Sequence, residues 1–161
     1  MEMFMDWNHV VTLKLSDNDE EIKLIPSTGM ADTILMHEDC NGCWSMIKSK
    51  WTPSRDQVVG GATAPLTKKT FSYIYMMSIE DVSAQGHYYT VDACLDSNTE
   101  ACANDLIVYA VHKAEPYFYS LNDGFLGLSP SRGIANSSKM NFIQQMFDRG
   151  MIAKKQFGVH T

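Results

Sequence analysis

The chain has 161 residues, 45% of them hydrophobic and 20% charged, so it is long enough to bury the core of one domain. Its formal net charge of −6 argues against nucleic acid and anionic membrane as partners, because both bind basic patches. No apolar run is long enough to cross a bilayer, so we expect no membrane-spanning segment.

Six segments have the alternation of apolar and polar residues, or the β-branched and aromatic content, that is typical of strands. The predicted strands are 10–15, 22–25, 33–36, 71–79, 87–91 and 106–111. The acidic cluster at 17–21 is interpreted as a solvated turn, and loops are expected at 60–62 and 129–136. The chain is therefore predicted to be mainly β.

One helix is predicted, over residues 141–149 near the C-terminus. Its apolar residues recur at helical spacing on one face, and Gly150 follows where a helix commonly stops. Either Ser138 or Asn141 is placed to cap its first turn.

The four cysteines, Cys40, Cys43, Cys94 and Cys102, lie in two close pairs. An even number at short spacing favours two local disulfides, 40–43 and 94–102. A zinc site is the rival, although the second pair lacks the spacing of zinc ligands. A thioredoxin-like redox motif is a third alternative, but Asn-Gly between the first two cysteines indicates a tight turn instead. We expect no metal and no other cofactor.

Three sequence patterns occur in an order that resembles a known family. Residues 24–29 read Leu-Ile-Pro-Ser-Thr-Gly, and the pair Cys40 and Cys43 begins 13 residues after Ser27. Residues 71–75 read Phe-Ser-Tyr-Ile-Tyr, and residues 122–128 read Asn-Asp-Gly-Phe-Leu-Gly-Leu ahead of the predicted helix. The chain resembles pepsin-like aspartic proteases over about residues 7–161.

This resemblance implies a single N-terminal protease lobe over 1–161, built of closed or sandwiched β-sheets with one short C-terminal helix. It implies a flap-like hairpin at about 71–91, with Tyr75, Met76 and Met77 as candidate substrate contacts. The glycines of 122–128 are expected to let a strand pass close to the turn that carries the catalytic aspartate, where a side chain would collide. The family continues after the helix with a strand containing Phe157.

The resemblance places Ser27 where the family has its catalytic Asp. Aspartic proteases use two carboxylates that share a proton, one from each lobe. Thr28 and Gly29 are kept, so the turn itself is expected to survive, but a serine cannot act as the base. Met30 replaces a small hydroxyl residue of the family, so the degenerate site Ser27, Thr28 and Gly29 is expected to hold no intact catalytic group.

Two other residues could supply catalytic chemistry in principle, Asp32 as the acid and Ser27 as a nucleophile, and neither has the sequence pattern that its role needs. Asp32 begins the only other Asp-Thr pair, but Ile34 follows in place of Gly, and Asp32 lies past the turn. Serine nucleophile chemistry at Ser27 would need a base with its own orienting partner, and the five histidines are dispersed in the sequence.

The favoured hypothesis is a catalytically inactive lobe with a binding or structural role. The alternatives are one half of an aspartic-type endopeptidase that needs a second lobe, and an unrelated β-rich domain with a cysteine metal or redox site. In the first two, the turn face is expected to meet a protein partner, a second lobe or a second copy of the chain, and to bind an extended peptide.

The compartment is not fixed by the sequence. The family and the cysteines favour a secretory, lysosomal or vacuolar protein, and Asn136 begins a glycosylation sequon. Residues 1–7 lack the basic and apolar regions of a signal peptide, so the chain either is not secreted or has lost its leader.

Overall fold

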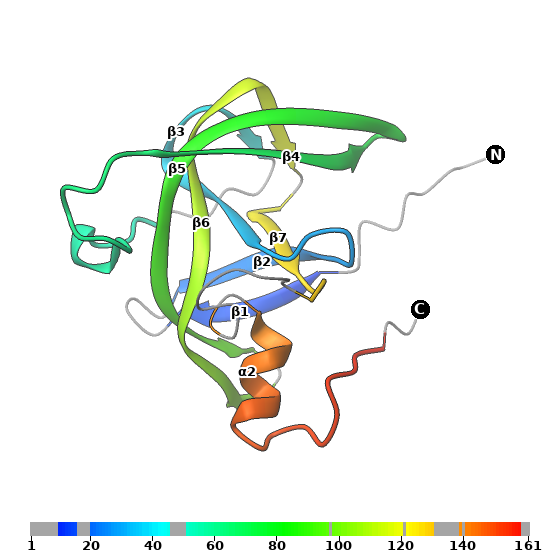
Figure 1. Ribbon diagram of the computed structural model, residues 1–161. Helices are drawn as coiled ribbons and strands as arrows, with labels where there is room; N and C mark the ends of the chain where they lie inside the picture. The colour runs from blue at the N-terminus through cyan, green and yellow to red at the C-terminus, as the bar shows by residue number, and fades with distance from the viewer. Residues whose placement is uncertain are drawn as a thin grey trace.

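The computed structural model describes residues 10–15, 20–45, 51–96, 98–120, 122–130, 139 and 141–158. Long strands dominate this part of the chain, with a short 3-10 helix η1 and one α-helix, α2 (Figure 1). In chain order the elements are β1 (Val11–Leu15), β2 (Glu20–Ser27), β3 (Thr33–Ser45), η1 (Arg55–Gln57), β4 (Thr67–Tyr75), β5 (Ser78–Leu95), β6 (Asn98–Ser120), β7 (Gly124–Gly127) and α2 (Phe142–Asp148).

The seven strands form one mixed sheet in the order β1-β2-β7-β3-β6-β5-β4. An additional antiparallel pairing between β1 and β5 closes this sheet on itself and leaves β4 at an edge. The β2–β7 and β3–β6 pairs are parallel, and the other pairs are antiparallel. The predicted fold class, mainly β with a closed sheet and one short C-terminal helix, is confirmed.

Strand β6 has apolar side chains buried on both of its faces. Leu106, Val108 and Ala110 belong to one hydrophobic cluster, which Phe142 and Met146 of α2 also join. Tyr109 and Val111, which point the other way, belong to a second cluster with Phe118 and Phe125. The continuous apolar run that predicted a strand at 106–111 therefore reflects burial on two sides.

Several predicted boundaries were too short, and one predicted strand is wrong. The segment predicted as one strand over 71–79 is broken by a two-residue turn at Met76 and Met77, which have φ of 47° and 68°. Neither residue is the Gly or Asn that usually marks such a turn, so the residue types indicated a continuous strand, whereas the family resemblance implied a hairpin here. Residues 157–158 are not a strand, in contrast to the family pattern, and Val159 lies outside the described residues.

Helix α2 starts as predicted. The Asn141 side chain accepts a hydrogen bond of 3.0 Å from the Gln144 backbone N–H, which caps the first turn. Gly150 has φ of 71° just after the helix, as expected of a glycine at a helix end. The other candidate cap, Ser138, lies outside the described residues, as do 17–19 of the predicted turn and 131–136 of the predicted loop. Residues 20–21 of the predicted turn belong to β2 instead.

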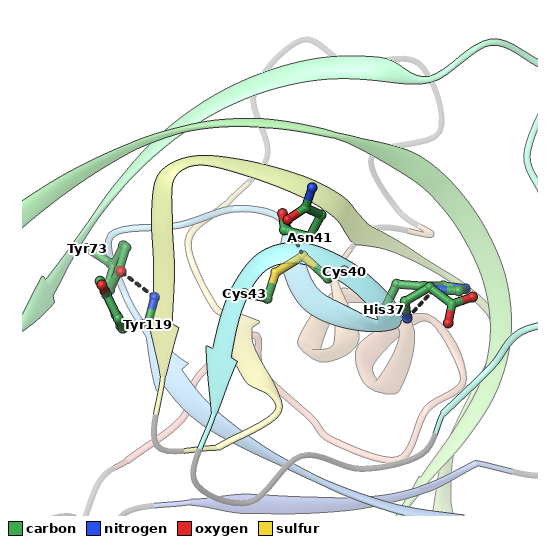
Figure 2. The surroundings of a disulfide bond; sticks show 7 residues. His37, Cys40, Asn41, Cys43, Tyr73 and Tyr119 are labelled. Carbon is green, nitrogen blue, oxygen red and sulfur yellow. Dashed lines mark hydrogen bonds between the residues drawn. A yellow bond between two sulfur atoms is a disulfide. The ribbon is translucent and has the colours of Figure 1, made fainter.

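All four cysteines are paired as disulfides, Cys40 with Cys43 and Cys94 with Cys102. The predicted pairing is confirmed, and the hypothesis of a cysteine metal site is wrong because no thiol is left to bind an ion. The Cys40–Cys43 bond closes a tight turn within β3 (Figure 2), not at the start of a helix as a thioredoxin-like motif would. The second bond links facing residues of the β5–β6 hairpin.

In the part of the chain that the structure describes, no helix has the length and apolar character needed to cross a bilayer.

Strand β7 passes so close to β3 that two of its positions have no room for a side chain. A Cβ on Gly124 would lie 2.0 Å from the Ile34 carbonyl oxygen, and one on Gly127 would lie 2.5 Å from the Ala31 carbonyl oxygen. The predicted reason for these glycines, close approach of a strand to the turn after β2, is therefore confirmed.

We predict that Gly124→Ala lowers the free energy of unfolding by about 3 kcal/mol or more, because the new methyl group meets fixed backbone. Urea denaturation followed by circular dichroism measures the change. Gly158→Ala is the matched control, since a Cβ there meets nothing within 4 Å, and it should leave stability within about 0.5 kcal/mol. Equal stability of the two variants would contradict the packing described for β7.

Candidate functional site

The turn at Ser27 is held by backbone contacts to β7. Ser27 ends β2 and pairs with Gly127, and the Leu128 N–H donates to the Ser27 carbonyl at 2.9 Å. On the far side of the turn, the Ser129 N–H donates to the Met30 carbonyl at 3.0 Å. The Gly127 N–H donates to Thr33 Oγ1 at 3.2 Å. The Ser27 side chain accepts none of these bonds, so the turn does not depend on the identity of residue 27.

A cleft of about 520 Å³ lies between this turn and the β4–β5 hairpin. Ser27 is half-buried in it, whereas Thr28 and Gly29 are exposed. Its described lining residues are mostly apolar and come from β2, the turn, β4, β5 and β7: Ile25, Pro26, Ser27, Thr28, Gly29, Met30, Ser72, Tyr73, Ile74, Ile79 and Phe125.

The polar groups of this cleft are hydroxyls. Among its described lining residues there is no carboxylate, imidazole or amine. The Tyr73 oxygen accepts a hydrogen bond of 2.8 Å from the Tyr119 N–H (Figure 2), and burial raises the pKa of this phenol above its usual value. Ser27, Thr28 and Ser72 can hydrogen-bond a peptide or a water, but a hydroxyl cannot serve as the base at acidic or neutral pH.

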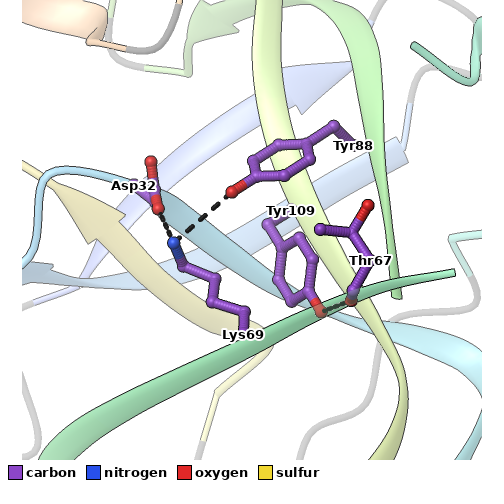
Figure 3. Close-up of polar contacts among 5 residues, drawn as sticks. All are labelled: Asp32, Thr67, Lys69, Tyr88 and Tyr109. Carbon is purple, nitrogen blue, oxygen red and sulfur yellow. Dashed lines mark hydrogen bonds and ion pairs between the residues drawn. The ribbon is translucent and has the colours of Figure 1, made fainter. Parts of the chain in front are cut away.

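Asp32, the alternative acid considered from the sequence, is engaged elsewhere. It is 7% exposed and forms an ion pair with Lys69 of β4, whose Nζ also donates to the Tyr88 hydroxyl at 3.4 Å (Figure 3). Burial alone would lower the pKa of Lys69, but the hydrogen bond and the charge of Asp32 outweigh it and raise this pKa above 10.5. Asp32 is therefore the buried counter-ion of a half-buried lysine.

The same lysine anchors the base of the β4–β5 hairpin to the sheet. Lys69 Nζ lies 5.9 Å from the ring centroid of Tyr88 and 5.8 Å from that of Tyr109. The Tyr109 hydroxyl donates to the Thr67 carbonyl at 2.6 Å, two residues before Lys69 (Figure 3). Because Asp32 follows the Ser27 turn directly, this ion pair fixes one wall of the cleft relative to the other.

The tip of this hairpin carries four large apolar side chains in water. Ile74 and Ile79 face each other across the two strands and are 74% and 76% exposed. Met76 and Met77 form the turn between them and are 63% and 68% exposed. Exposed apolar groups in a turn of unfavourable φ weaken the isolated chain, which is a common property of binding elements.

The three candidate substrate contacts predicted from the sequence lie in this hairpin. The Tyr75 ring stacks on Tyr119 at 5.5 Å, and Met76 and Met77 stand at the tip; these three are not among the described residues that line the cleft. Ile74 and Ile79 do line it and were not predicted, because each occupies the solvent side of an edge hairpin where a polar residue is usual. Asn136 of the sequon lies outside the described residues.

Comparisons with known proteins give a similarity of fold. No protein-family model matches this sequence, and no curated protein matches it either. Among solved structures, the aspartic proteinase from Irpex lacteus matches with a TM-score of 0.51 and 18% sequence identity over 91% of this chain. The match spans 37% of the length of the fungal proteinase. The chain therefore has a pepsin-like fold.

We predict that Lys69→Met lowers the free energy of unfolding by about 3 kcal/mol, because it leaves the Asp32 carboxylate buried without its partner. Combining it with Asp32→Asn should cost less than the two single changes together. Urea denaturation of all four proteins gives this coupling energy. Strictly additive losses would show that the two groups do not interact.

The raised pKa of Lys69 also sets the pH range of this ion pair. Its contribution to the free energy of unfolding is present below pH 10.5 and is lost as the pH rises through the folded pKa.

We predict that replacing Met76 with Asn and Met77 with Gly stabilises the chain by about 1–2 kcal/mol, because Asn-Gly adopts positive φ at low cost. The thermal unfolding midpoint measures the gain. The reversed order, Met76→Gly with Met77→Asn, is a composition-matched control. An unchanged midpoint in both variants would show that the methionines are not strained.

Proposed function

We propose that this chain is a single pepsin-like lobe that binds protein or peptide through its cleft and does not hydrolyse peptide bonds. The observation that carries the proposal is Ser27, half-buried at the point of the cleft where the resemblance places the catalytic aspartate. Hydrolysis by the aspartic mechanism requires carboxylates at this point, one to activate water and one to protonate the peptide. The described lining supplies hydroxyl and apolar groups in their place.

Two properties of the cleft support a role in binding. Its apolar walls favour burial of side chains, and it is within the usual size range of ligand sites. Strand β4 is an edge strand beside it, so its outer backbone groups can pair with an extended segment of a partner. Side chains of such a segment would alternate between the cleft and solvent, and Ile74 and Ile79 would cover the segment from the hairpin side.

The partner that best fits this face is another protein. That protein is a second copy of the chain, a second lobe, or an unrelated partner. The exposed Ile74, Met76, Met77 and Ile79 continue the apolar surface of the cleft onto the hairpin tip. An apolar surface of this kind is usually covered in a working complex. The net charge of −6 favours a partner whose contact surface is neutral or basic.

A second candidate function is one half of an aspartic-type endopeptidase. It is favoured by the match to 37% of the length of the fungal proteinase, which leaves room for a second lobe. In that arrangement the other lobe would supply one catalytic carboxylate. This chain would still supply none at position 27, where it has a serine.

We predict no pepstatin-sensitive peptide hydrolysis by the pure chain between pH 3 and pH 7, because no described cleft residue can act as the base. Fluorogenic peptide assays measure the hydrolysis. Ser27→Ala is the matched control, and its rate should equal that of the native chain at the background level. Ser27→Asp should also remain inactive alone, since a lone carboxylate lacks its partner. Inhibitor-sensitive turnover by the native chain would overturn the proposal, and turnover by Ser27→Asp only after addition of a second lobe would favour the endopeptidase half.

A further inference from the structure

Three histidines that are far apart in the sequence meet in the folded chain. His37 lies on β3, His87 on β5 and His112 on β6, and these strands are neighbours in the order β3-β6-β5. The rings of His37 and His112 stack with centroids 4.0 Å apart, and the His87 ring meets His112 edge-on at 5.3 Å. None of the three is among the described residues that line the cleft, so the cluster is a separate feature.

The cluster is packed into the protein on its inner side. His37 is 6% exposed, and the Tyr89 ring lies within 6.3 Å of all three imidazoles, measured between centroids. Trp51 packs edge-on against the other side of Tyr89 at 5.9 Å. The cluster therefore connects three strands to the segment 51–58, which contains η1 and joins β5 through the bridge between Val58 and Tyr89.

The hydrogen bonds are those of uncharged imidazoles. The Asp39 N–H donates to His37 Nδ1 at 3.1 Å, so this nitrogen has a lone pair and carries no proton. His112 Nε2 lies 2.9 Å from the Tyr89 hydroxyl, which can donate to it when the imidazole is neutral. Protonation of His37 Nδ1 removes this acceptor and places a donor against the Asp39 N–H. At His112 the Tyr89 hydroxyl must turn from donor to acceptor when Nε2 takes up a proton.

We propose that His37, His87 and His112 form a proton-sensitive lock, which holds segment 51–58 against strands β3, β5 and β6 near neutral pH and loosens it in mild acid. The lock works because the three rings can pack this closely only while most of them are uncharged. Two imidazolium ions whose rings are 4.0 Å apart repel each other, and water screens little of that repulsion around a buried ring.

The charges around the cluster act on the pKa of His112 in opposite directions. Burial first, and then charge on His37 and His87, together lower the pKa of His112 to about 4, while Asp39 opposes the shift. Charged groups on the elements packed here also include Glu38, which accepts from Thr52, and Lys113, which pairs with Glu115. Arg55 and Asp56 lie on η1, and the charge of Arg55 acts on Tyr89. The Tyr89 phenol is neutral in this range, because burial raises its pKa.

The sign of the pH effect follows from the lowered pKa. An unfolded chain protonates His112 near pH 6.5, whereas the folded chain resists protonation down to about pH 4. Between these values the unfolded state binds more protons, so stability falls as the pH falls. The cluster contributes fully to the free energy of unfolding above about pH 6.5, and this contribution is lost as the pH falls toward 4.

The test is the thermal unfolding midpoint of the full chain at pH 7.5 and at pH 5.0. The native protein should lose roughly 5 °C between these two values. His112→Gln keeps an acceptor for Tyr89 and cannot take up a proton, so it should lose less than about half as much. Tyr89→Phe is the matched control: it removes the hydroxyl, keeps the three imidazoles, and should retain the pH dependence at a lower midpoint. An equal loss in the native protein and in His112→Gln would overturn the proposal.

A second measurement keeps the proposal testable should His112→Gln fail to fold. Proton NMR of the imidazole C–H groups in the native chain should show at least one histidine with a midpoint well below 6.5. Hydrogen exchange, corrected for its intrinsic pH dependence, should be faster in segment 51–58 at pH 5.5 than at pH 7.5, with little change in α2. Five midpoints near 6.5, or uniform exchange across the chain, would rule out a lock.

Discussion

The close passage of β7 against β3 is the constraint on which the rest of this structure depends. At Gly124 and Gly127 two backbones approach to distances that exclude any side chain. This contact places β7 between β2 and β3, and it thereby completes the sheet that β1 and β5 close. It also supplies the backbone donors that hold both sides of the Ser27 turn. The fold and the site are thus products of the same contact.

This contact also explains how the Ser27 turn keeps its place. The bonds that hold the turn run between main-chain groups and Thr33, so the side chain at position 27 is free to differ without loss of the fold. Asp32, the buried acid that follows the turn, is paired with Lys69 and serves to fasten the hairpin base. Charge near the turn is therefore used for stability, and the cleft itself is left with hydroxyl and apolar groups.

The sequence predicted the features whose signals are local. Gly124 and Gly127 could be read as points of close approach, the disulfides followed from spacing, and the cap at Asn141 followed from residue type. The features it missed depend on pairing across the sheet. The Asp32–Lys69 ion pair, the lining role of Ile74 and the meeting of the histidines have no local signature, because each partner is brought in by a different strand. The Met76–Met77 turn was implied only by the family resemblance, because its residues contradict the usual turn preference.

The pairing of β2 with β7 also has a consequence for the order in which the molecule can form. The hydrogen bond from the Lys23 N–H to the Asp123 carboxylate joins residues separated by 100 positions in the chain. By contrast, β4, β5 and β6 follow one another and pair as successive hairpins, which can close as soon as they are synthesised. On a ribosome, the Ser27 turn must wait for residue 128 to emerge before it acquires its partners. The cleft is therefore the last part of the sheet to be assembled, and a nascent chain exposes its apolar lining until residue 128 has emerged.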